Sequence, residues 1–209
     1  MSATICAKYM VERYTSRLQL SIRVLPLFFL LCGSLYAQGD NLGVAIIVGE
    51  NDAWMIETPE GWNLDQRAAL AAGLGATFVP EGSFWSSSPV VMYANGIPKS
   101  TDTVTVASVI RNDSLKAIST DAGTIVKRSE PIGTIQGVDA EVCYIIRADS
   151  MLCEAIAYIN GCSGIAIIVL SARNAGDFHN SLDAFSRLVD SYEWITSDPE
   201  RIAELKRMR

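Results

Sequence analysis

Hydrophobic side chains along the chain follow two repeating patterns. In short runs such as 53–58 and 75–79, apolar and polar residues alternate or cluster between turn residues, which predicts β-strands. Near the C-terminus, apolar residues instead recur every three or four positions, which predicts a helix with one continuous buried face. The positions of this stripe are Phe178, Leu182, Phe185, Val189 and Tyr192. The chain therefore combines strands and helices.

The same patterns, read with turn residues, predict the order of the elements. Further strands are expected at 42–48, 89–95, 124–126, 132–135, 138–147, 152–159 and 165–170. Helices are expected at 65–72 and from Thr101 or Asp102 to about Ile118. A third helix should begin after an Asn174 cap and contain the apolar stripe, and a fourth should begin after Ser197. Asn160-Gly161 is typical of a two-residue hairpin. Consecutive hairpins pair strands antiparallel, so the pattern predicts an α+β fold with a curved antiparallel sheet flanked by helices.

The N-terminal segment has the layout of a secretory signal. It begins with basic residues, continues with an apolar run at 24–31, and reaches Ala37 through small residues. The basic residues are Lys8, Arg13, Arg17 and Arg23. The apolar run is shorter than the roughly 20 residues that a membrane-spanning helix needs.

We therefore expect a signal peptide at 1–37 and a single exported domain at 38–209, periplasmic or secreted, with no stable membrane span after cleavage. A lipid anchor at Cys32 and an uncleaved N-terminal anchor are the alternatives. Of the 17 basic and 23 acidic residues, four basic and one acidic lie in 1–37, so the mature 172 residues carry a net charge of −9. This acidity disfavours nucleic-acid binding.

Three cysteines, Cys143, Cys153 and Cys162, lie in the predicted mature chain. An odd number leaves at least one thiol unpaired within the chain, and the spacing lacks the CxxC pattern of metal sites. Cys153 and Cys162 lie at opposite ends of one extended run, and Cys143 should face residues near 156, so close pairing is not expected. We expect three small apolar side chains in a sheet; a disulfide to another chain or a reactive thiol is the alternative.

Several landmarks resemble a known family. They are Ile56-Glu-Thr-Pro-Glu-Gly-Trp62, Phe78-Val-Pro80, Val91-Met-Tyr-Ala-Asn95, Val169-Leu-Ser-Ala-Arg173 and the closing helix 185–192 with Trp194. Over about 52–196 the chain resembles secreted bacterial Mog1/PsbP-like proteins of unknown function. The resemblance implies an α/β/α sandwich. It implies an accessory, assembly or binding module but no activity, because a fold does not determine a function.

Candidate catalytic groups are few. The single histidine, His179, excludes sites that need two imidazoles, and no phosphate-binding glycine loop is present. His179 lies one position from the apolar stripe, so we expect it at the solvent edge of the helix. Asp177 and Asp183 lie near it, but an acidic first helical turn explains them without a metal. We therefore expect no catalytic residues, no metal site and no cofactor.

Large aromatic residues on loops are the strongest binding signal in the sequence. Trp62 follows a Pro-Glu-Gly turn, and Phe84 and Trp85 lie in a loop of small polar residues. Such residues either anchor a partner or fold back over the sheet edge. The sequence predicts an exported, non-catalytic binding or accessory module with an unknown protein or small-molecule partner. The alternatives are an exported hydrolase that uses a Ser or Cys nucleophile with His179, and a structural envelope component.

Overall fold

The computed structural model describes residues 43–101, 103–121, 123–147 and 152–208. The predicted signal at 1–37, the alternative cap Asp102 and the expected turn at 148–151 lie outside the described residues. The described elements belong to one compact unit, Leu42–Arg209. None of the helices in the described ranges has the length and apolar character needed to cross a membrane.

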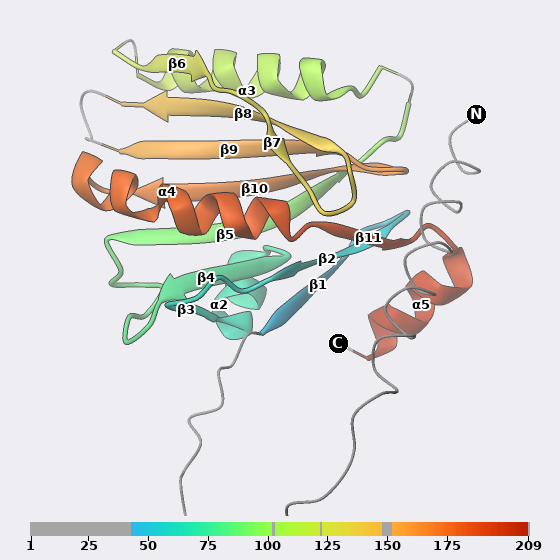
Figure 1. Ribbon diagram of the computed structural model, residues 1–209. Helices are drawn as coiled ribbons and strands as arrows, with labels where there is room; N and C mark the ends of the chain where they lie inside the picture. The colour runs from blue at the N-terminus through green and yellow to red at the C-terminus, as the bar shows by residue number, and fades with distance from the viewer. Residues whose placement is uncertain (1–42, 102, 122, 148–151, 209) are drawn as a thin grey trace, which may run out of the picture. The chain divides into compact units, whose positions relative to one another are not determined.

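Most strands form one antiparallel sheet of eight strands (Figure 1). Its order is β3-β4-β5-β10-β9-β8-β6, and β7 also pairs with β8. The strands are β3 Trp62–Leu64, β4 Ala76–Pro80, β5 Val90–Pro98, β6 Ile125–Arg128, β7 Ile132–Gly133, β8 Asp139–Ile146, β9 Cys153–Asn160 and β10 Gly164–Ala172. The antiparallel pairing predicted between 138 and 170 is confirmed by the β8–β9 and β9–β10 registers.

Three further strands form a smaller antiparallel sheet in the order β1-β2-β11. They are β1 Val44–Val48, β2 Ala53–Glu57 and β11 Glu193–Thr196. The hydrophobic pattern did not predict β11, and it placed Trp62 of β3 in a turn. Both strands are short and each is defined by a partner distant in sequence: Trp62 pairs with Pro80, and Trp194 pairs with Trp54.

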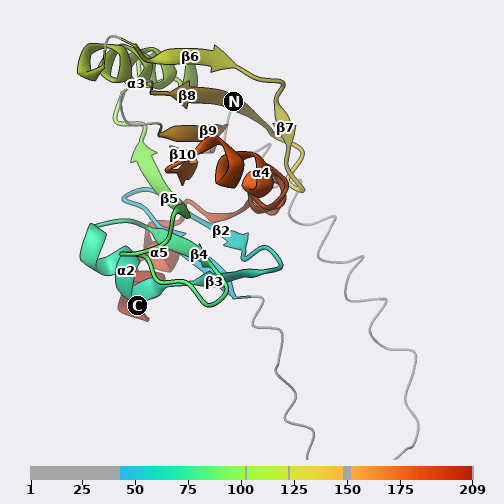
Figure 2. The ribbon, with the colours of Figure 1, turned by 90° about the vertical axis from the view of Figure 1, so that its left-hand side faces the viewer.

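Helices cover both faces of the large sheet, as the α+β prediction requires. The described helices are α2 Gln66–Ala72, α3 Val106–Thr120, α4 Ala175–Asp190 and α5 Pro199–Arg207. Figures 1 and 2 show α4 on one face and α3 with α2 on the other side. The alternation of side chains along each strand divides the apolar residues into two core layers, one beneath α4 and one beneath α3.

The start of α3 corrects the sequence prediction. The helix begins at Val106 and its cap is Thr105, not Thr101 or Asp102. The Thr105 side chain accepts from the Ser108 backbone N–H at 3.1 Å, and the Ser108 hydroxyl accepts from the Thr105 N–H at 3.0 Å. This reciprocal capping box satisfies two backbone donors at once, so it outcompetes the earlier candidates.

The β9–β10 turn is also longer than predicted. Asn160 ends β9 and Gly164 begins β10, so residues 161–163 form the connection instead of a two-residue turn. The Lys99 ammonium donates to the Gly161 carbonyl at 2.7 Å, and the Lys99 N–H donates to the Ser163 carbonyl at 3.0 Å. These contacts come from the end of β5, so a tertiary neighbour sets the length of the turn.

The closing helix confirms the predicted apolar stripe. Phe178, Phe185 and Val189 are buried, and the predicted cap Asn174 accepts from the Asp177 N–H at 2.9 Å. Leu182 is only partly buried. The buried face is broader than the stripe because α4 lies on a sheet, and it also includes Ser181, Ala184 and Leu188.

The cysteines of β8 and β9 lie on opposite faces of the sheet. Cys143 pairs with Ile156, as predicted, and its side chain joins the layer beneath α3. Cys153 joins the layer beneath α4. Both are buried, and burial raises the pKa of each thiol. Cys162 is partly exposed in the β9–β10 turn and is disulfide-bonded, so the expectation of a small apolar side chain in the sheet is wrong for this cysteine.

Candidate functional site

The structure separates the three aromatic residues that the sequence singled out. Trp62 is only 8% exposed and belongs to the core beneath α4. Phe84 and Trp85 lie in the loop between β4 and β5, where Phe84 is 73% exposed and Trp85 is half-buried. Trp62 therefore contributes to packing, whereas the other two aromatic side chains reach the surface.

Hydrogen bonds hold the loop that carries Phe84. The Ser87 and Ser88 N–H groups both donate to the Phe84 carbonyl, at 3.1 and 2.9 Å. The Ser88 hydroxyl donates to the Val90 carbonyl at 2.5 Å, which ties the loop to the start of β5. Gly82 supplies the positive φ of 75° that the entry turn requires. An exposed aromatic side chain thus projects from an ordered backbone.

Trp85 packs against Tyr93 of β5. Their ring centroids are 6.2 Å apart and the ring planes are 81° apart, an edge-to-face arrangement. Tyr93 is half-buried on the α3 side of the sheet, where its side chain also contacts the core layer beneath that helix. The loop residue Trp85 is therefore anchored to the sheet by an aromatic pair, and both residues remain partly exposed.

Two charged residues lie on the same side of the sheet. Ser171 of β10 pairs with Glu154 of β9 and with Val91 of β5, so Glu154 shares a face with Tyr93. The Arg147 guanidinium lies 3.5 Å from the Glu154 carboxylate. Burial raises the pKa of Glu154, and the positive charge of Arg147 and a hydrogen bond from Ser171 offset part of that rise.

A second carboxylate comes from α3. The Tyr158 hydroxyl donates to Asp113 Oδ2 at 2.9 Å across the helix–sheet interface. Burial and the negative charges of Glu154 and Asp113 raise the pKa of Tyr93 to about 12, and the positive charge of Arg147 acts in the opposite direction. We call the set Phe84, Trp85, Tyr93, Asp113, Arg147 and Glu154 the Tyr93 surface.

Sequence reasoning found Phe84 and Trp85 but missed the other four members of the Tyr93 surface. One signal was available for Glu154: it is a charged residue in a strand that is otherwise apolar, on the same face as Ile156 and Tyr158. Tyr93, Asp113 and Arg147 come from three separate elements, and only the folded sheet brings them together.

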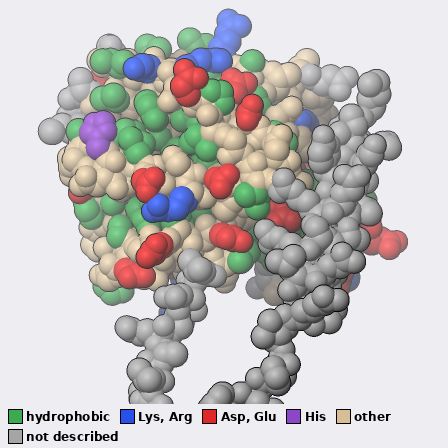
Figure 3. All heavy atoms as spheres, in the orientation of Figure 1, with side chains coloured by type: hydrophobic (Ala, Val, Ile, Leu, Met, Phe, Trp, Pro, Cys, Tyr) green, Lys and Arg blue, Asp and Glu red, His purple; other side chains and the backbone are tan. Residues whose placement is uncertain are grey.

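His179 is exposed near the start of α4, as the stripe predicted, and Figure 3 shows this imidazole at the margin of the face. Its ring contacts Phe178, with centroids 5.6 Å apart. Among the described residues, no serine or cysteine side chain is hydrogen-bonded to His179. In the same part of the chain, no group of three or more His, Cys, Asp or Glu side chains is arranged to hold a metal ion.

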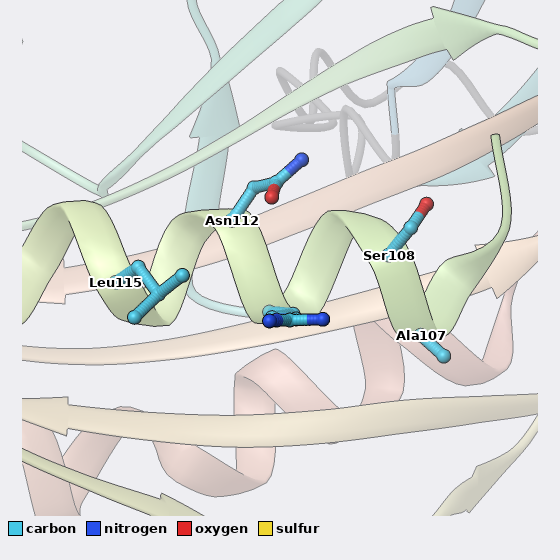
Figure 4. Close-up of a pocket in the computed structure, with 5 residues that line it drawn as sticks. Ala107, Ser108, Asn112 and Leu115 are labelled. Atoms are coloured by element: carbon cyan, nitrogen blue, oxygen red, sulfur yellow. The ribbon is translucent and has the colours of Figure 1, made fainter. Parts of the chain in front are cut away.

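A separate hollow of about 400 Å³ lies on the outer side of α3 (Figure 4). The described residues that line it are Ala107, Ser108, Arg111, Asn112 and Leu115. All of them belong to one helix. In Figure 4 the side chains of Asn112 and Ser108 point to one side of the helix and Ala107 points to the other, so they do not converge on a common point.

A polar junction connects the two sheets. Asp52, in the β1–β2 turn, is 8% exposed, and its carboxylate lies between the backbones of Gly49 and Gly164. Burial raises the pKa of Asp52 and lowers the pKa of Lys99, and the attraction between the two opposite charges offsets part of each shift. Because the three-stranded sheet inserts a carboxylate into the turn of the other sheet, this junction has a structural role.

Comparisons with known proteins describe the fold of the chain. No protein-family model matches it, and no curated protein matches it. The solution structure of the cyanobacterial PsbP of Synechocystis is similar over 79% of this chain and 98% of its own, at 12% identity and a TM-score of 0.47. A crystal structure of a Pseudomonas aeruginosa protein of unknown function is similar over 75% and 98%, at 14% identity and a TM-score of 0.44.

The Saccharomyces cerevisiae Ran-binding protein Mog1p is similar over 73% of this chain and 95% of its own, at 10% identity and a TM-score of 0.42. The resemblance to PsbP-like and Mog1-like proteins that the sequence led us to expect is met again in these structures. At these identities it describes the fold and not the function.

Proposed function

We propose that the protein is an exported, non-catalytic binding or accessory module that engages a protein partner through the Tyr93 surface, with Phe84 as the anchor. The observation that carries the proposal is the exposure of Phe84 on a hydrogen-bonded loop beside the Trp85–Tyr93 pair. Binding at such a loop costs little ordering entropy because its backbone is already held.

The exposed area of Phe84 is large enough to matter. A phenylalanine that is 73% exposed offers about 3 kcal/mol of burial free energy to a partner, at about 25 cal/mol per Å². Aromatic residues in the centre of interfaces carry a large share of the binding energy. The neighbouring Trp85 in the loop and Tyr93 on β5 supply further aromatic area.

Affinity capture from the exported fraction of the native source tests the proposed partner site. Phe84→Ala should abolish or strongly reduce a specific captured protein. Leu70→Ala is the matched control, because Leu70 of α2 is also 73% exposed and lies outside the Tyr93 surface. Equal capture by the wild type and both variants would contradict the proposal.

The export part of the proposal rests on the basic start, the short apolar run and Ala37. Intact-mass measurement of the exported fraction should give a mature chain that begins at or near Gln38. A mature chain that retains residues 1–37 would contradict cleavage.

A further inference from the structure

The charges of the Tyr93 surface do not balance. Its ionisable side chains are the carboxylates of Asp113 and Glu154 and the guanidinium of Arg147, so two negative charges face one positive charge. The chain as a whole carries a net charge of −6. Both the local and the overall charge therefore favour the approach of a cation.

The contact between Arg147 and Glu154 is weak. It consists of one pair of atoms 3.5 Å apart, at the limit of hydrogen-bond distance, whereas strong guanidinium–carboxylate pairs are shorter and use two parallel bonds. Arg147 Nε is buried and has no hydrogen-bond acceptor among the described residues. The Glu154 side chain is 12% exposed, so its carboxylate remains within reach of the surface.

Tyr93 lies on the same face of the sheet as Glu154, with β10 between their strands. The faces of Trp and Tyr rings carry negative electrostatic potential and attract ammonium and guanidinium groups. Trp85 and Tyr93 are partly exposed, and the exposed Phe84, which precedes Trp85 in the loop, offers apolar surface to an alkyl stem. Rings next to carboxylates match the chemistry of a lysine or arginine side chain, which has an apolar stem and a cationic end.

We propose, on the basis of the function proposed above, that the Tyr93 surface binds a lysine or arginine side chain of the protein partner. The alkyl stem packs on Phe84 and Trp85, and the charged end lies toward Glu154 and Asp113. An anionic group bound to Arg147 is the competing arrangement. It is disfavoured because that group would approach two carboxylates in an acidic protein.

Titration calorimetry of the full chain with short oligoarginine and oligoglutamate peptides tests this proposal. Oligoarginine should bind and oligoglutamate should not. Trp85→Ala and Glu154→Gln should each weaken oligoarginine binding about tenfold. Arg147→Gln removes the competing cation and should strengthen oligoarginine binding roughly threefold. This gain cannot arise from misfolding, so it keeps the test decisive if another variant is unstable.

Asp183→Asn is the matched control for charge. Asp183 is exposed on α4, on the opposite side of the sheet, where it pairs with Arg187. Its loss changes the net charge by the same amount as Glu154→Gln but should leave oligoarginine affinity nearly unchanged. Equal weakening by both variants, preference for oligoglutamate, weaker binding after Arg147→Gln, or no oligoarginine binding would each overturn the inference.

The partner-capture experiment separates this inference from the proposed function. Capture that depends on Phe84 and also on Glu154 supports both. Capture that depends on Phe84 but is unchanged in Glu154→Gln retains the binding module and overturns the cation site. Capture that is unchanged in Phe84→Ala overturns the proposed function itself.

Discussion

Replacing Gly164 by alanine tests the packing of the polar junction between the two sheets. An ideal Cβ at this position would lie 2.6 Å from Asp52 Oδ2 and 3.1 Å from the Ile97 carbonyl oxygen. On its other side the carboxylate lies against Gly49, where an ideal Cβ would be 2.5 Å from its second oxygen. The Ile97 carbonyl belongs to β5, which is paired with β10 and cannot shift alone.

The expected cost of Gly164→Ala follows from two opposing effects. Overpacking a closed site costs about 1–3 kcal/mol. Replacing glycine by alanine also restricts the unfolded chain, which stabilises the folded state by about 0.4–1 kcal/mol. The free energy of unfolding should therefore fall by about 1–2 kcal/mol in Gly164→Ala.

Urea unfolding followed by circular dichroism measures this cost. Gly96→Ala is the matched control in the neighbouring strand: the nearest atom to its ideal Cβ is Trp54 Nε1 at 3.7 Å, an ordinary contact. It should leave stability unchanged or slightly higher. In an Asp52→Ala background the cost of Gly164→Ala should shrink, because the carboxylate that the new methyl group meets has been removed.

Two results would refute this reasoning. The first is a Gly164→Ala cost no greater than that of Gly96→Ala, which would mean that the junction yields to an extra methyl group. The second is an unchanged loss of stability on Gly164→Ala in the Asp52→Ala background, which would mean that the new methyl group does not clash with the carboxylate.

Three further predictions concern other parts of the fold. Phe185→Ala should lower the free energy of unfolding by about 3–5 kcal/mol because this side chain is 1% exposed. The control Ser186→Ala should change it by no more than about 0.5 kcal/mol. Equal losses of stability for the two variants in urea titrations would contradict the assigned helix face. On a panel of esterase, amidase and phosphatase substrates, the wild type and His179→Gln should give the same turnover. Turnover by the wild type that is lost in His179→Gln would establish a hydrolase, since a general base contributes about 10²–10⁴-fold in rate. The pKa of Tyr93 is raised from 10.0 to about 12, so the stability contributed by its neutral hydroxyl should be lost as pH rises through this range. Tyr93→Phe should therefore reduce the decline of the free energy of unfolding between these pH values. An unchanged decline would show that Tyr93 is not the group that titrates.

The sequence predicted the elements whose signals are local. The apolar stripe of α4 is visible because Phe178, Phe185 and Val189 repeat at helical spacing, and burial on one face imposes that spacing. The register of Cys143 opposite Ile156 follows from the length of the hairpin that joins β8 and β9. The cap Asn174 is also local, because its side chain accepts from a backbone N–H three residues away.

Tertiary structure decided the features that depend on partners distant in sequence. The strands β3 and β11 are too short to show a periodic pattern, and they exist because β4 and β2 offer unpaired edges. Lys99 sets the length of the β9–β10 turn from the end of another strand.

The candidate site also contains some residues that the sequence made conspicuous and others that only the fold brought together. Large aromatic residues in a small polar loop made Phe84 and Trp85 conspicuous in the sequence. No local pattern distinguishes Trp62, which the fold buries, from Trp85, which it leaves half-exposed. The carboxylates of Asp113 and Glu154 lie about forty positions apart in the sequence. They share a face of the sheet with Tyr93 only because β9, β10 and β5 are adjacent and α3 packs against β9, β8 and β6, which is a property of strand order and not of sequence spacing.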